Sequence, residues 1–149
     1  MTSSVSLKFN SGRFDFKSEL PEQYNAGNRF YGSDLAEFLS EGLASTGSKA
    51  NCFDEDWGWM VSYSNERGQN VEIAIYNLSE HMEGGRPGAP VWGLWMRAFS
   101  RKKVLGFIPR TVEAEFPQDL IKIVYDIFER EGITLEAWED GPDTKAEPA

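Results

Sequence analysis

The chain has 149 residues, a size typical of one globular domain, and its 40% apolar and 26% charged residues are ordinary values for a folded protein. These proportions exclude a wholly disordered chain, and the lack of any internal period excludes repeat architectures. The formal charge of −9, with a pI near 4.6, argues against binding to nucleic acid or to an anionic membrane surface.

The single cysteine, Cys52, limits covalent and metal chemistry. It excludes an intrachain disulfide and a cysteine-rich zinc site. Residues 1–5 lack the basic and apolar regions of a signal peptide, and no apolar run approaches the roughly 20 residues that span a bilayer. We therefore expect a cytoplasmic protein, with no membrane association and no cofactor.

Alternating apolar and polar residues at the N-terminus predict a β-hairpin. The alternation runs over residues 5–9 and resumes over residues 14–17, after Ser11-Gly12. A Ser-Gly pair between two alternating runs is typical of a tight turn. We expect the two strands to pair and the second to end before Pro21.

An apolar stripe predicts the first helix, which begins near residue 33. Ser33 suits the N-cap position, and Asp34 lies in the first turn, where the helix dipole favours negative charge. The stripe has the spacing of an amphipathic helix, and its members are Leu35, Phe38, Leu39 and Leu43. Gly47 is expected to stop the helix.

Three further strands are predicted in the middle of the chain. Residues 57–63 and 71–76 alternate in character and are joined by the turn-forming residues 65–68, so they predict a second hairpin. A loop rich in glycine and proline, residues 84–90, leads into a third strand over residues 91–101.

The C-terminal third predicts a helix and a short strand. Pro117 suits a helix start, residues 120–128 form a broad apolar face, and Gly132 ends the helix. A short strand follows over residues 133–137. We expect one domain, residues 1–139, and an acidic flexible tail, residues 140–149. The order ββ-α-βββ-α-β predicts an α+β two-layer sandwich, a mostly antiparallel sheet with two helices on one face.

The strand predicted over residues 91–101 supplies candidate partner-binding residues. Trp92 and Trp95 point to opposite faces of it, and two helices cover only one face, so one of these tryptophans is expected on the open face. Exposed aromatic surface rimmed by charge is typical of partner-binding patches. The candidates are Trp92, Trp95, Arg97 and, from the glycine-rich loop, Arg86.

Basic residues concentrate at the end of the same strand. They are Arg97, Arg101, Lys102, Lys103 and Arg110. The functional interpretation is contact with an acidic partner or a phosphate group. The plainer one is a charged strand end followed by a solvated turn.

Acidic residues and the single histidine provide candidates for chemistry. Asp54 and Asp56 lie two apart, so on a strand they share a face and can act as acid and base or as ligands of a hard cation. His81 is a potential general base. The plainer interpretation is a solvated acidic turn and a surface histidine. Cys52 has no neighbouring base in the sequence and is expected to be an inert small hydrophobe. No metal site is predicted.

The chain resembles a known family in three segments and in the order in which they occur. They are Tyr31-Gly32-Ser33-Asp34-Leu35-Ala36-Glu37-Phe38-Leu39, Asp54-Glu55-Asp56-Trp57-Gly58-Trp59 and the strand from Trp92 to Lys103. The family is a group of small bacterial proteins that share a Glu-Asp-Trp-Gly-Trp signature and have no assigned function. The resemblance implies a bacterial, cytosolic α+β domain and transfers no catalytic residue.

Two functional hypotheses follow. The first is a non-enzymatic, cytosolic protein-binding module, such as an acidic inhibitor or immunity-type protein, because an acidic surface speeds association with basic targets. The alternative is a small enzyme or ligand-binding protein that uses Asp54, Asp56 and His81, which would have to line one pocket.

Overall fold

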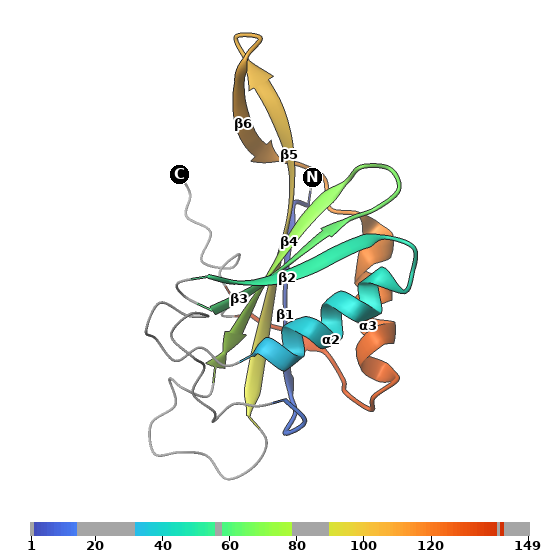
Figure 1. Ribbon diagram of the computed structural model, residues 1–149. Coiled ribbons are helices and arrows are strands. Elements are labelled where there is room, and N and C mark those ends of the chain that lie inside the picture. Colours follow the sequence, from blue (N-terminus) through green and yellow to red (C-terminus); the bar gives the residue numbers. More distant parts are fainter. Residues whose placement is uncertain (1, 15–31, 56–57, 79–89, 140, 142–149) are drawn as a thin grey trace.

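The computed structural model describes residues 2–14, 32–55, 58–78, 90–139 and 141, which form one antiparallel sheet and two helices (Figure 1). The strands are β1 (Ser4–Asn10), β2 (Lys49–Glu55), β3 (Gly58–Ser64), β4 (Asn70–Asn77), β5 (Val91–Val104), β6 (Ile108–Glu113) and β7 (Glu136–Ala137). The helices are α2 (Ser33–Ala44) and α3 (Gln118–Glu129). The strand order is β2-β3-β4-β5-β1-β7, with β6 paired to β5. The predicted α+β sandwich is confirmed.

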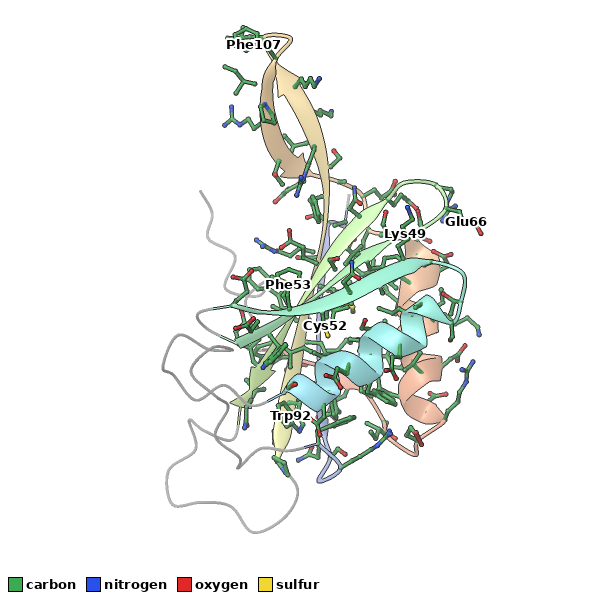
Figure 2. All side chains as sticks on the ribbon, in the orientation of Figure 1. Lys49, Cys52, Phe53, Glu66, Trp92 and Phe107 are labelled. Atoms are coloured by element: carbon green, nitrogen blue, oxygen red, sulfur yellow. The ribbon has the colours of Figure 1, made fainter. Side chains whose placement is uncertain are left out.

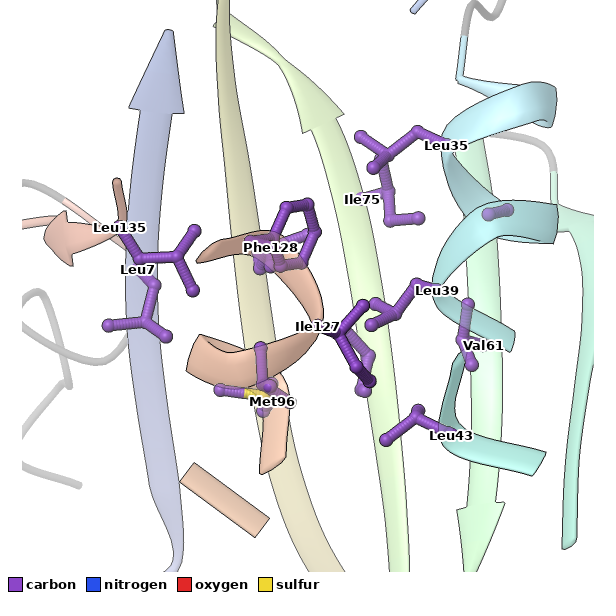
Figure 3. Packing of buried hydrophobic residues seen from close by; sticks show 14 of the residues in the cluster. Leu7, Leu35, Leu39, Leu43, Val61, Ile75, Met96, Ile127, Phe128 and Leu135 are labelled. Atoms are coloured by element: carbon purple, nitrogen blue, oxygen red, sulfur yellow. The ribbon is translucent and has the colours of Figure 1, made fainter. Parts of the chain in front are cut away.

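Both helices pack on the same face of the sheet and enclose the core (Figures 1 and 3). Helix α2 buries Leu35, Leu39 and Leu43, at the spacing predicted from the sequence. Helix α3 contributes Val124 and Phe128. Neither helix has the length and apolar character that a membrane crossing requires.

An aromatic cluster joins the helices to the strands. The Phe128 ring lies 4.9 Å from the Phe9 ring of β1 and 5.3 Å from the Phe38 ring of α2, between ring centroids. Phe14 lies 5.4 Å from Phe38 and 6.4 Å from Trp92 of β5. Such tilted and edge-on aromatic pairs add to the stabilisation that burial alone provides.

Strand β5 is the central strand of the sheet and also extends beyond it. Its inward side chains, Trp92, Leu94, Met96 and Ala98, are all buried against the helices. β1 pairs with β5 as far as Arg97, and β4 pairs with it as far as Phe99. From there β5 pairs with β6 alone, through Val104 opposite Ile108. Residues 99–113 thus form a two-stranded ribbon, here called the arm, which projects from the body (Figure 1).

The pairing predicted for the N-terminal hairpin is not found among the described residues, which exclude residues 15–17 of its second strand. β1 pairs with β5 and β7, and residues 11–14 form no strand. Phe14 is instead buried in the aromatic cluster, so its apolar character reflects core packing rather than strand alternation. Phe16 lies outside the described residues. The second predicted hairpin, now β3 and β4, is confirmed.

Two strands and one helix cap differ from the prediction. β2 was not predicted because its inward residues are small or polar, and β6 was not predicted because nearly all of it is exposed and shows no apolar period. Ser33 is the first residue of α2, not its N-cap; Gly32 occupies that position with φ +122°, a conformation that favours glycine. Gly132 ends the α3 region as predicted, at φ +75°.

The two tryptophans of β5 provide a matched test of the face assignment. Trp92→Ala should lower the free energy of unfolding by about 3–5 kcal/mol, because the side chain is fully buried. Trp95→Ala should cost less than about 2 kcal/mol, because the ring faces away from the helices and is half-buried. Urea unfolding followed by circular dichroism measures both values. Equal losses would contradict the assignment.

Candidate functional site

The sheet register determines which predicted residues reach the open face. Trp92 is 0% exposed and belongs to the core, so of the two tryptophans it is Trp95 that lies on the face away from the helices. The backbone of Trp95 lies between Ala74 of β4 and Ser6 of β1. Small neighbours on both sides leave room for the large indole on this face.

Arg97 lies next to Trp95 on the same face of β5. Its guanidinium carbon is 4.5 Å from the Trp95 ring centroid, a cation–π geometry. Its Nη2 is 3.8 Å from Oε2 of Glu72, the residue directly opposite on β4. The ion pair is long and partly exposed, so it contributes little to stability. Arg97 is therefore a charged group that a ligand or partner can recruit at small cost.

A cavity of about 460 Å³ opens beside these residues, where the arm leaves the body. It is lined by Ser3, Ser4, Glu72, Trp95, Arg97, Ala98, Phe99, Thr111, Val112 and Glu113. The walls combine aromatic surface, two carboxylates and one guanidinium. Because β1, β4, β5 and β6 all contribute, the cavity exists only once these strands are paired. Its chemistry suits side chains of a partner that are apolar at one end and polar at the other.

Trp138 covers the open face on the other side of Trp95. A β-carbon at Gly93 would lie 2.7 Å from Cζ3 of Trp138, so the absence of a side chain at Gly93 makes room for this indole. The ring centroids of Trp138 and Tyr76 are 5.7 Å apart. Burial raises the pKa of the Tyr76 hydroxyl, and Arg97 partly opposes the change. This end of the open face is thus closed by aromatic packing.

The arm brings the basic residues singled out in the sequence next to three apolar candidates that the sequence interpretation missed. At its tip Leu105 is 78% exposed, Phe107 73% and Ile108 45%. Figure 2 shows Phe107 at the end of the arm. Its four basic residues, Arg101, Lys102, Lys103 and Arg110, are all exposed. The signal available in the sequence is the short apolar run of residues 104–108, which follows three consecutive cations and was not singled out.

The residues proposed for chemistry are only partly described. Asp54 lies near the end of β2, paired with Trp59 of β3, rather than in a solvated turn. Asp56, His81 and Arg86 lie outside the described residues, as does Trp57 of the Glu-Asp-Trp-Gly-Trp motif. Among the described residues no three His, Cys, Asp or Glu side chains cluster as metal ligands would. The enzymatic alternative therefore stays a prediction.

Cys52 lies on β2, packed against the edge of the core and facing α2 (Figure 2). Burial raises the pKa of its thiol, and the carboxylates of Glu37 and Glu41 on α2 raise it further, although a backbone hydrogen bond acts in the opposite direction. A nucleophilic cysteine requires the opposite environment, one that stabilises the thiolate. The surroundings therefore favour the inert role expected from the sequence.

Comparison of the chain with protein-family models, with curated protein sequences and with solved structures found no significant match. No residue role is therefore transferred from another protein, and the candidate site rests on its geometry alone.

The thiol of Cys52 gives a test of the local electrostatics. Its alkylation by iodoacetamide should follow a pH profile with a midpoint above the ordinary thiol value of 9.0. Glu37→Gln should lower the midpoint by removing a nearby negative charge, and Glu41→Gln should lower it less. Glu129→Gln, at the end of α3, is the control and should leave it unchanged. A midpoint at or below that of a free thiol would contradict this account.

Proposed function

We propose that the chain is a non-enzymatic, cytosolic protein-binding module and that the arm is its main contact element. The observation that carries the proposal is the exposure of three large hydrophobic side chains, Leu105, Phe107 and Ile108, at the tip of a ribbon that projects from the body. Exposed apolar side chains on a projecting element are typical of surfaces that become buried on association.

The energetics of the arm support this role. An isolated two-stranded ribbon is at best marginally stable in water. Every side chain described between residues 101 and 111 is exposed, so this part of the arm gains almost no burial from the body. A partner that covers the arm would supply the missing apolar contacts. The arm is thus built for association rather than for the stability of the domain.

The backbone conformation at the tip of the arm also supports contact with a partner. Leu105 has φ +56° and is followed by Gly106 at φ +83°. The left-handed region costs a branched residue such as leucine roughly 1 kcal/mol, whereas Asn or Gly adopts it readily. An exposed leucine that pays this cost without local packing is best explained by a contact outside the chain.

The cavity beside Trp95 extends the proposed contact surface from the arm onto the body. Tryptophan and arginine are the residue types that most often dominate interface energetics. Trp95 and Arg97 are adjacent, line one cavity and lie on the same side of β5 as Phe99 at the base of the arm. A partner seated against the arm would therefore meet them as well.

If the protein is an acidic inhibitor or immunity-type protein, the acidic body rather than the arm makes the contact with the partner. Residues 99–113 contain four basic residues and one acidic residue, which gives the arm a net charge of +3. Because the whole chain has a net charge of −9, the residues outside the arm together carry −12. An immunity-type protein would meet a basic target with the acidic body. A basic partner would therefore indicate contact through the acidic body, and an acidic partner contact through the arm.

A comparative pull-down tests the proposal. The wild-type protein and the double variant Leu105→Asn, Phe107→Ser are immobilised and exposed to lysate of cells that make the protein. Asn is chosen because it tolerates the positive φ of position 105. The variant should recover at least about tenfold less of a stoichiometric partner, because the apolar anchors are removed.

Phe53→Ser is the matched control, since Phe53 is also an exposed aromatic residue, 41% exposed, but lies on β2, outside the arm. The control should retain the partner. Equal recovery by wild type and the arm variant would overturn the assignment of the arm as the contact element.

A further inference from the structure

The cations of the arm differ from those of the body in how they are paired. The described part of the body has seven cations, of which five lie within 4 Å of a carboxylate oxygen, the longest distance being 3.8 Å: Lys8, Arg13, Arg67, Arg97 and Lys122. The other two, Lys49 and Arg130, make no such pair with a described residue. On the arm, Arg101, Lys102, Lys103 and Arg110 make no ion pair with any described residue. The chain has an excess of acidic residues, yet none of the described carboxylates lies within ion-pair distance of these four cations.

The register of the arm also places like charges together. Lys102 and Arg110 are directly opposite each other across β5 and β6, on one face of the ribbon. Arg101 and Lys103 lie on the other face, opposite Thr111 and Pro109. Like charges at directly opposed positions destabilise a strand pair. Both faces of the arm are therefore basic, and anionic groups that approach from outside would relieve the repulsion.

We infer that the arm binds an acidic surface of a different protein, with Phe107 and Leu105 inserted into an apolar pocket and the four cations facing carboxylates on its rim. This inference rests on the proposed function and adds the chemistry of the partner. Charge complementarity is its basis, because a basic arm on an acidic protein steers the approach of an acidic partner through the arm rather than through the body.

A second copy of the chain fits this surface poorly. Two arms laid side by side would bring together net charges of +3 each, and two whole chains would each carry −9. Like net charges of this size keep a protein monomeric. Among the described residues outside the arm, Phe53 is the one large hydrophobic side chain that is well exposed, so apart from the cavity at Trp95 the body offers little apolar surface to receive a tip.

Strand addition to the arm is also disfavoured. Pro109 has no N–H group, so β6 lacks one backbone donor along its length, and proline in a strand is typical of edges that do not pair further. Charged residues on short edge strands discourage such pairing as well. The contact is therefore made by the side chains of the tip and flanks.

Site-specific photo-crosslinking tests the inference in the cells that make the protein. Phe107 is replaced by the photoreactive amino acid benzoylphenylalanine, with the same replacement of Phe53 in a separate sample as the control. Irradiation should give a covalent adduct with one other protein from position 107 and not from position 53. Mass spectrometry of the crosslinked peptide then locates the contact, which should lie in an apolar pocket surrounded by Asp and Glu.

The purified partner provides the quantitative test. The double variant Lys102→Gln, Arg110→Gln should bind it about tenfold more weakly than wild type, and the wild-type affinity should fall steeply as salt is raised. Lys122→Gln, an exposed lysine of α3, is the matched control and should bind as wild type does. Thermal unfolding of each variant confirms that the body is intact, since the arm contributes little to its core.

The outcomes separate the two proposals. An adduct with a protein whose contact surface is neutral or basic, or unchanged binding by the Lys102 and Arg110 variant, overturns the acidic partner and leaves the protein-binding module standing. Crosslinking from position 107 to a second copy of the chain, to nucleic acid or to lipid also overturns the inference. A lack of any adduct from position 107 overturns the proposed function together with it.

Discussion

The apolar alternation of β5 ends at Ala98, and the rest of the structure depends on where it ends. Up to that residue the inward positions are apolar and fit beneath α2 and α3. The next inward positions are Ser100 and Lys102, and burying an ammonium group without a partner is prohibitively costly. The same strand therefore forms the centre of the sheet in its first half and must leave the body in its second half.

The cations of the body and those of the arm are also arranged differently. Five of the seven cations in the described part of the body lie in exposed ion pairs such as Arg13 with Glu131, 2.9 Å apart, each of which contributes little to folding. The cations of the arm have no such partner among the described residues and lie next to an apolar tip. Neither arrangement is needed for the stability of the core. Placing positive charge and apolar surface together on one projecting ribbon is instead what recognition of an acidic protein would require.

Part of the candidate site was accessible from the sequence. Alternation along β5 indicated that Trp92 and Trp95 face opposite ways, but not which of them the helices cover, because both faces of that strand carry large apolar residues. Glu72 was not singled out, since its position beside Arg97 follows from the β4–β5 register. The arm was missed because β6 has no buried face, and strand prediction relies on the alternation that burial imposes.

The sequence by itself determined the class of the fold, both helices, the β3–β4 hairpin and the acidic balance, because helical and strand periodicities are local records of which side chains are buried. The tertiary structure decided which strands are neighbours. It paired Leu7 with Leu94, moved Phe14 from a supposed strand into the core, and left Trp95 rather than Trp92 on the open face. These features depend on contacts between residues far apart in the chain, and no local pattern records such contacts.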